Sequence, residues 1–103
     1  MGLLSLLGIK TKREKVAEFM EKGAIIIDVR TPQEFQSGHI KVSKNIPLDK
    51  ISGSIKKIQK TGKPVITVCR SGARSAQAAA ILRSNGIEAM NGGAWNYLQS
   101  LLR

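Results

Sequence analysis

The stretch of sequence that decides the fold reads Pro64-Val65-Ile66-Thr67-Val68-Cys69-Arg70-Ser71-Gly72-Ala73-Arg74-Ser75. An apolar run ends here at the only cysteine of the chain, and an alanine-rich segment continues from the loop to residue 84. This order is typical of a buried strand that gives way to a loop and then to a helix. Cys69 is therefore predicted to lie at the carboxyl end of a strand, beside the first turn of a helix.

Three physical effects would stabilise a thiolate at this position. The N–H groups that open the helix point toward it, the positive end of the helix dipole favours its charge, and the guanidinium groups of Arg70 and Arg74 lie nearby in sequence. Gly72 allows backbone angles with which successive N–H groups converge on one anion. The pattern favours Cys69 as a nucleophile over a small buried hydrophobic residue. This interpretation requires a sulfur that solvent can reach and that titrates below the range of a free thiol.

Other short motifs accompany the cysteine loop in a fixed order. They are Ile25-Ile26-Ile27-Asp28-Val29-Arg30-Thr31-Pro32-Gln33-Glu34-Phe35, Gly38-His39-Ile40, Asn45-Ile46-Pro47 and Asn91-Gly92-Gly93-Ala94-Trp95. Together with the loop, they resemble the single-domain rhodaneses, a family of sulfurtransferases, over about residues 11 to 102. The resemblance implies a rhodanese-like α/β fold, with Cys69 as the catalytic residue and Arg70, Ser71, Gly72, Ala73 and Arg74 as the active loop that binds substrate.

The resemblance also implies a two-step sulfur transfer without a cofactor. A Cys69 thiolate would take sulfur from a small anionic donor such as thiosulfate, and the resulting persulfide would pass it to a thiol or protein acceptor, or to cyanide in vitro. Arg70 and Arg74 are the candidates for holding the sulfonate of the donor. Their spacing from Cys69 does not distinguish the arginine that contacts substrate from one that fixes the loop.

Loop length favours sulfur transfer over phosphate hydrolysis. Four residues separate Cys69 from Arg74, whereas the cysteine phosphatases that resemble rhodaneses in fold have five. A shorter loop forms a tighter ring of N–H groups, which fits a single terminal sulfur. The sequence also shows no obvious acid beside the loop to protonate a leaving alcohol. Two alternatives remain: a sulfur carrier or interaction module that does not turn over, and, less favoured, a cysteine-dependent phosphatase.

The remaining motif residues are interpreted mainly as scaffold. Asp28, Arg30 and Ser75 are predicted to support the site, with Arg30 paired to Asp28 or Glu34 so that neither charge is buried alone. His39, the only histidine, is expected to make a structural hydrogen bond rather than act as a base. Trp95 is expected to pack the last helix onto the core, although it follows the glycine pair more closely than is common in the family.

Local signals predict alternating strands and helices. Capping boxes at Thr11 and Thr31 begin two helices, the second with proline at its first position. Strands are predicted at residues 24–29, 64–68 and 87–90. Further helices are predicted at 75–85 and 95–102, and around Ile51, Ile55 and Ile58, which share one face. This alternation predicts a mainly parallel sheet covered by helices on both faces, with ligands bound beyond the carboxyl ends of the strands.

Composition narrows the class of protein. A chain of 103 residues, 42% hydrophobic, suits one domain with a single core. One cysteine and one histidine exclude an internal disulfide and a typical structural zinc site, so no metal is expected. A free reactive thiol suits the reducing cytoplasm. The net charge of +10 would favour encounter with anionic donors and acidic partners. Dispersed lysines and few aromatic residues argue against specific binding of nucleic acid.

Residues 1–10 are predicted to be an apolar and basic extension of a domain that spans residues 11–103. The apolar residues 2–9 are too short to cross a membrane and lack the features of a signal peptide. Leu6 stands where a myristoylation motif requires serine or threonine. Docking on the domain is favoured over self-association or contact with a membrane surface.

Overall fold

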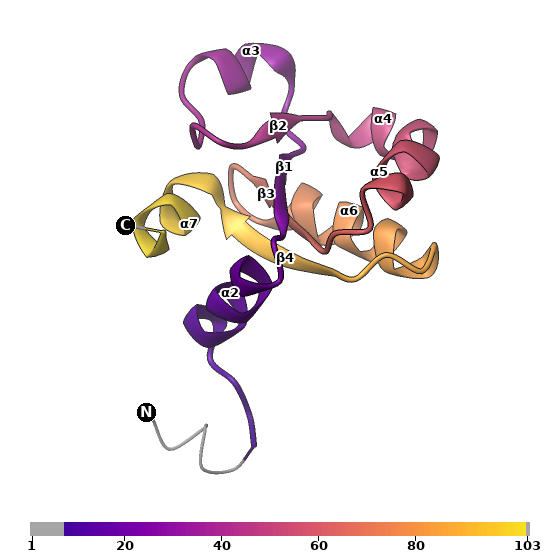
Figure 1. Ribbon diagram of the computed structural model, residues 1–103. Coiled ribbons are helices and arrows are strands. Elements are labelled where there is room, and N and C mark those ends of the chain that lie inside the picture. Colours follow the sequence, from indigo (N-terminus) through magenta and orange to yellow (C-terminus); the bar gives the residue numbers. More distant parts are fainter. Residues whose placement is uncertain (1–7, 103) are drawn as a thin grey trace.

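The computed structural model describes residues 8–102 and has a parallel β-sheet at its centre (Figure 1). The order across the sheet is β2-β1-β3-β4, and every pair of neighbours is parallel. The strands are β1 (Ile25–Asp28), β2 (Lys44–Asn45), β3 (Val65–Cys69) and β4 (Ala89–Ala94). The predicted α/β fold with a parallel sheet is therefore confirmed.

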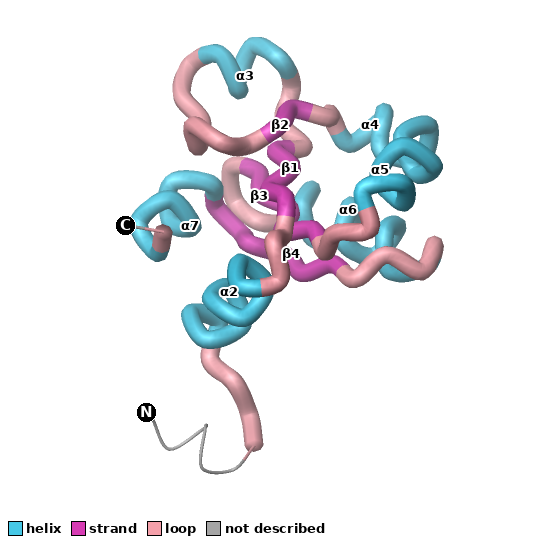
Figure 2. The backbone as a smooth tube through the Cα atoms, viewed as in Figure 1, coloured by secondary structure: helices cyan, strands magenta, loops and turns pink. Residues whose placement is uncertain are grey.

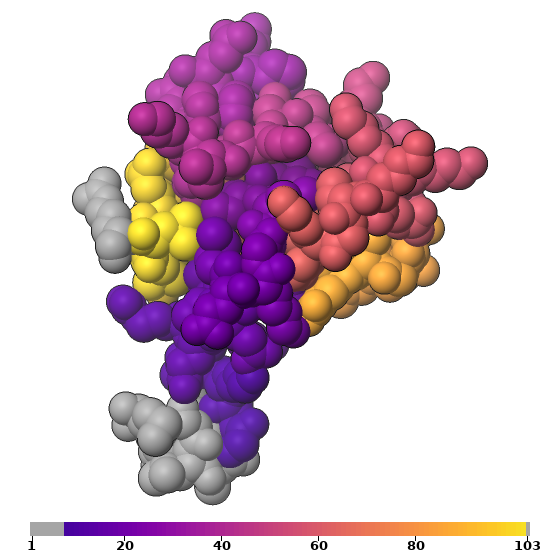
Figure 3. Space-filling view, viewed as in Figure 1, coloured from indigo at the N-terminus to yellow at the C-terminus, as the bar shows by residue number. Residues whose placement is uncertain are grey.

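Helices cover both faces of this sheet, as the view by secondary structure shows (Figure 2). On one face lie α2 (Lys12–Glu21) and α7 (Trp95–Leu101). On the other lie α4 (Leu48–Ile51), the 3₁₀ turn η1 (Ser52–Ser54), α5 (Ile55–Thr61) and α6 (Ala73–Ser84). Helix α3 (Pro32–Gln36) lies beyond the carboxyl end of β1, and the purple segment around it forms one end of the molecule above α7 and α2 (Figure 3).

Each face of the sheet has its own buried apolar cluster. Ile26 faces the cluster that includes residues of α2 and α7, and its neighbour Ile27 faces the cluster that includes residues of α4, α5 and α6. Successive side chains of a strand point to opposite faces, so a strand buried on both sides is mostly apolar, and its buried polar residues, Asp28 in β1 and Thr67 in β3, form hydrogen bonds. This explains the continuous apolar runs at β1 and β3.

The predicted helix starts are confirmed at both capping boxes. Thr11 Oγ1 accepts a hydrogen bond from the Glu14 N–H at 3.2 Å, and the Glu14 carboxylate accepts one from the Thr11 N–H at 2.9 Å. Thr31 and Glu34 form the same reciprocal pair, with Pro32 at the first helical position of α3. Each box satisfies two N–H groups that a helix start would otherwise leave unpaired.

Other predicted boundaries were wrong. The helical face of Ile51, Ile55 and Ile58 is divided between α4 and α5 by η1. Helix α6 begins at Ala73, two residues before the predicted start, so its first turn belongs to the cysteine loop. Strand β2 was not predicted, because two residues carry no periodic pattern.

The last strand was predicted at residues 87–90 but extends to Ala94, across the glycine pair. Its register with β3 shifts, since Thr67 pairs with Asn91 while Val68 pairs with Gly93, which leaves Gly92 as an extra residue. A Cβ atom on Gly92 would lie 2.7 Å from Ile66 Cγ2 and 2.8 Å from the Thr67 carbonyl oxygen. Glycine is depleted in strands, which is why the sequence pattern ended the strand too early.

Residues 8–102 include no helix that is long and apolar enough to cross a membrane. The predictions for residues 2–9 fall mainly on residues outside the described range. Ile9, which is described, is 54% exposed. The boundary between an extension and a domain at residue 11 stays a prediction.

The tight contacts of Gly92 predict a large cost for a single methyl group. Gly92→Ala is expected to lower the free energy of unfolding by about 1–3 kcal/mol, because β3 cannot move away without disrupting both apolar clusters. Gly53→Ala is the matched control, since a Cβ atom there meets nothing within 4 Å. Urea denaturation should show a lower midpoint for Gly92→Ala only; equal midpoints for the two variants would contradict this account of the bulge.

Candidate active site

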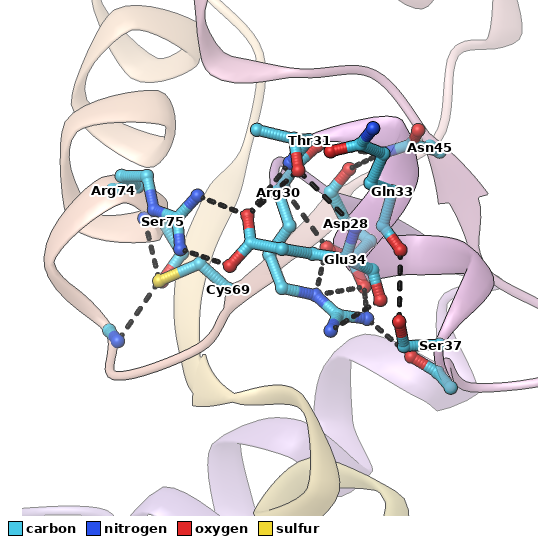
Figure 4. Close-up of polar contacts among 12 residues, drawn as sticks. Asp28, Arg30, Thr31, Gln33, Glu34, Ser37, Asn45, Cys69, Arg74 and Ser75 are labelled. Carbon is cyan, nitrogen blue, oxygen red and sulfur yellow. Dashed lines mark hydrogen bonds and ion pairs between the residues drawn. The ribbon is translucent and has the colours of Figure 1, made fainter.

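The carboxyl ends of the parallel strands bring the predicted site residues to one edge of the sheet. Asp28 ends β1, Asn45 ends β2 and Cys69 ends β3. The Asn45 side-chain amide donates hydrogen bonds to the carbonyl oxygens of Asp28 and Arg30, at 3.0 and 2.9 Å, and so ties two of these ends together. Figure 4 shows Arg74 and Ser75 beside Cys69 at the start of α6, with Glu34 between Arg74 and the group of Asp28, Arg30 and Asn45.

The sulfur of Cys69 lies at the start of α6, where N–H groups converge on it. The Gly72 N–H donates to Sγ at 3.0 Å and the Ser75 N–H at 3.4 Å. The Ser75 hydroxyl oxygen lies 3.3 Å from Sγ. Gly72 has φ of 104°, a backbone conformation that side chains other than glycine rarely adopt, and this turns its N–H back toward the cysteine. The predicted loop geometry is therefore present.

The expectation of a solvent-accessible sulfur is wrong for this structure. Cys69 is 0% exposed, because it ends a strand that is buried on both faces and the loop folds back over it. Arg70, Ser71 and Ala73 of the same loop are exposed. Reagents therefore reach Sγ only when the loop moves.

Burial and hydrogen bonding act in opposite directions on the pKa of Cys69. Burial has the largest single influence and raises the pKa, since it disfavours the charged form. The Ser75 hydroxyl, the Ser75 and Gly72 N–H groups and, least, the Ser71 N–H each lower it. Together these donors prevail, and the pKa of Cys69 lies below its ordinary value. The loop thus favours an ionised sulfur in spite of its burial.

The two arginines of the loop have different surroundings. Arg74 forms a bidentate ion pair with Glu34, at 2.7 and 3.1 Å. Arg70 is exposed, and its side chain makes no hydrogen bond or ion pair with any residue from 8 to 102. The sequence left open which of the two arginines contacts substrate and which fixes the loop, and the structure pairs only Arg74 with an acid among the described residues.

Glu34 also corrects the expectation that no acid lies beside the loop. Its hydrogen bonds from the Arg74 guanidinium and the Thr31 N–H lower its pKa to about 2, although burial acts the other way. Glu34 is therefore ionised at neutral pH and cannot donate a proton. A phosphatase would therefore find no general acid in Glu34.

The predicted pairing of Arg30 with Asp28 is confirmed. The guanidinium donates to the buried Asp28 carboxylate at 2.7 to 3.1 Å, and also to the carbonyl oxygens of Glu34 and Gly38. It also lies 4.8 Å from the centre of the Trp95 ring. These bonds satisfy both charges of a buried pair and fix the segment that carries α3.

His39 has the structural role expected of it. Its Nδ1 lies 2.7 Å from the Phe35 carbonyl oxygen, and its ring stacks on that of Phe35. Two residues near Cys69 were given no role from the sequence. Thr67 donates from its hydroxyl to the Ser75 carbonyl oxygen at 2.7 Å, and the Asn91 side chain contacts Ser75 and Gly72. Asn91 precedes the glycine pair, but no local pattern indicates where its amide lies.

A parallel sheet with a cysteine loop at its carboxyl edge defines a class of α/β proteins that use a loop-bound thiolate. Comparison with known proteins makes the family specific: the model of the rhodanese-like domain matches residues 12–99. The chain belongs to the rhodanese-like domain family.

Individual relatives agree with this assignment. The protein YqhL of Bacillus subtilis is 41% identical over 78 residues, which cover 76% of this chain and 61% of YqhL. The thiosulfate sulfurtransferase GlpE of Pseudomonas syringae is 37% identical over 73 residues, or 71% of this chain and 68% of GlpE. The structure of a rhodanese-like domain protein from Staphylococcus aureus superposes with a TM-score of 0.69 at 32% identity, covering 85% of this chain and 86% of that chain. The matched region thus spans less than two thirds of YqhL.

The Glu34–Arg74 ion pair predicts a pH-dependent stability. The folded-state pKa of Glu34 is depressed, so its contribution is present above the unfolded value near 4.5 and is lost as pH falls toward 2. About a third of each side chain is exposed, and solvent screening limits the gain to about 1 kcal/mol.

Glu34→Gln should therefore destabilise the protein by about 1 kcal/mol at pH 7 and by much less at pH 2. Urea denaturation at both pH values measures the difference. A destabilisation that is the same at both would show that the charge of Glu34 contributes nothing.

Proposed function

We propose that this protein is a sulfurtransferase that works through a Cys69 persulfide. The Cys69 thiolate attacks the outer sulfur of thiosulfate or a related donor. A new S–S bond forms to Sγ, the bond to the sulfonate group breaks, and sulfite leaves with its electron pair. An acceptor thiolate then attacks the terminal sulfur and carries it away as a persulfide, and the Cys69 thiolate is restored.

The observation that carries this proposal is the convergence of N–H groups on Sγ. The N–H groups of Gly72 and Ser75 already point at the sulfur, and they come from a rigid helix start. Donors fixed in this way stabilise negative charge without reorganisation when it develops. They suit a thiolate before the first step and a persulfide anion after it. The thiosulfate sulfurtransferase relatives support the same chemistry.

The buried sulfur means that the loop must open for each transfer. Arg70 and Ser71 form the part of the loop between Cys69 and the Gly72 turn, and both are exposed. The Arg70 side chain does not anchor the loop, since it has no hydrogen-bond or ion-pair partner within residues 8–102. We infer that this segment is the part of the loop that moves to open Sγ to solvent, since Gly72 and Ser75 are held by their hydrogen bonds to the sulfur and Arg74 by its pairing with Glu34.

The surroundings of the two arginines suggest separate roles. Arg74 is already paired with Glu34, which suits a residue that fixes the start of α6 against α3. Arg70 follows the cysteine directly, and its guanidinium has no partner among residues 8–102, which suits a residue that binds the sulfonate of the donor.

The closed loop favours one alternative, a sulfur carrier or interaction module of rhodanese fold. Such a protein would accept sulfur from a small donor when the loop opens, but would release it to cyanide very slowly. The two functions differ in turnover with small molecules. A phosphatase is disfavoured by the short loop and by the ionised Glu34.

Intact-mass measurement after treatment with thiosulfate tests the proposal. The folded protein should gain the mass of one sulfur atom, and Cys69→Ser, which removes the only cysteine, should gain nothing. Addition of cyanide should return the loaded protein to its original mass within minutes. Loading with hardly any release to cyanide would support the carrier instead, and an unchanged mass would contradict both.

Arg70 and Arg74 should respond differently to substitution. Arg70→Ala is expected to raise the KM for thiosulfate about tenfold or more, through loss of a charge-assisted contact, with little change in the unfolding free energy. Arg74→Ala should lower the unfolding free energy by about 1 kcal/mol through loss of the ion pair. Lys57→Ala, which removes an exposed cation from α5, controls for net charge. Equal effects of Arg70→Ala and Lys57→Ala on KM would contradict the assignment.

A further inference from the structure

The amide of Asn91 joins three parts of the cysteine site, and its orientation is fixed by two backbone groups. The Gly93 N–H can only donate, and it points at Asn91 Oδ1 from 2.9 Å. The Gly72 carbonyl oxygen can only accept, and it lies 3.1 Å from Asn91 Nδ2. An amide turned by 180° would place Oδ1 against the Gly72 carbonyl oxygen and Nδ2 against the Gly93 N–H, and neither pair can form a hydrogen bond. The position of Oδ1 is therefore determined.

This fixed oxygen competes with the cysteine for one proton. The Ser75 hydroxyl lies 2.6 Å from Asn91 Oδ1 and 3.3 Å from Cys69 Sγ. A hydroxyl has a single proton to donate. While Cys69 is a neutral thiol, its S–H can donate to Ser75 Oγ, and the Ser75 proton goes to Asn91. When the sulfur is negative, the Ser75 hydroxyl must turn toward it to add its own hydrogen bond to those of the backbone N–H groups.

Asn91 can lose the hydrogen bond from the Ser75 hydroxyl at little cost. Its Oδ1 keeps the hydrogen bond from the Gly93 N–H when the serine turns away, so this part-buried oxygen is not left without a donor. The bulge at Gly92 makes this second hydrogen bond possible. Asn91 and Gly93 flank the extra residue, so the Gly93 N–H reaches Asn91 Oδ1.

We propose that Asn91 is a positioning residue that holds the Ser75 hydroxyl proton while Cys69 is a neutral thiol and releases it when the sulfur carries negative charge. The inference rests on the proposed function of Cys69, since it deepens the account of how the reactive sulfur is stabilised. Asn91 acts through Ser75 and does not itself contact the sulfur.

Charged groups near Cys69 come from several elements, and within residues 8–102 none of them forms a hydrogen bond with the amide of Asn91 in place of Ser75. Arg74 of α6 interacts electrostatically with Cys69, and also with Asp28 of β1 and Glu34 of α3. Asp28 is paired with Arg30. From α2, Lys12 reaches the backbone of Gly93, where its Nζ lies 2.5 Å from the place a Cβ atom would occupy. Arg70 adds a cation from the loop. Substitution of Asn91 leaves all of these in place.

Two substitutions of Asn91 should move the pKa of the thiol in opposite directions. Asn91→Ala removes the competing acceptor, so the pKa should fall by about half a unit to one unit, the equivalent of one hydrogen bond. Asn91→Asp keeps an acceptor at this place and adds a negative charge, so the pKa should rise by at least about half a unit. The absorbance of the thiolate near 240 nm measures both, because the chain has a single cysteine.

A double-mutant cycle separates this role from simple bracing of the loop. In a Ser75→Ala background, Asn91→Ala should no longer lower the pKa, because no hydroxyl remains to be released. Asn96→Ala, an exposed asparagine on α7, is the matched control. The same shift in both backgrounds, or a rise with Asn91→Ala, would overturn the proposal.

If Asn91→Ala does not fold, Asn91→Asp takes its place in the cycle: the rise in pKa should be smaller in the Ser75→Ala background than in the Ser75 background, and an equal rise in both, or no rise, would overturn the proposal. The titration uses no sulfur donor. The proposal about Asn91 can therefore fail while thiosulfate still loads Cys69, and it can hold while loading fails.

Discussion

The site depends on one interaction, the convergence of backbone N–H groups at the start of α6 on the sulfur of Cys69. Three features of the chain produce it. Strand β3 ends at the cysteine, Gly72 adopts a left-handed conformation, and α6 begins immediately after this turn. Gly72 in turn packs on β4, where a Cβ atom on it would lie 3.5 Å from Gly93 Cα. The Gly-Gly pair near the end of the chain thus shapes the loop that holds the sulfur.

The same geometry imposes a conflict between burial and charge. A thiol at the end of a strand covered on both faces loses its solvent, and this alone would keep it neutral and unreactive. The donors of the loop reverse the balance only because they are close and already oriented. The sulfur is therefore stabilised as an anion and closed to solvent at once. A persulfide held in this way would be shielded from other thiols, and its transfer would depend on movement of the loop.

Local chemistry explains which parts of this arrangement the sequence could predict. The two capping boxes, the buried strands and the Cys69–Ser75 loop depend on residues a few positions apart, and all are found. The pairing of Arg74 with Glu34 joins residues 40 positions apart, and no local pattern encodes it. The same is true of the Asn91 amide and of the closure over Cys69. The extension of β4 through Gly92 was not predicted, because a glycine pair in a sequence is typical of a turn. Only the close contact of Gly92 with β3 shows why glycine is required within the strand.

The most direct test of this account is to compare the pKa of Cys69 in the folded protein with that in the urea-unfolded protein. Absorbance of the thiolate reports both, and no other cysteine contributes. The account predicts a lower pKa in the folded protein, since the N–H donors of Gly72 and Ser75 exist only there. An equal or higher pKa in the folded protein would mean that burial prevails over the loop, and that Cys69 is a buried structural thiol.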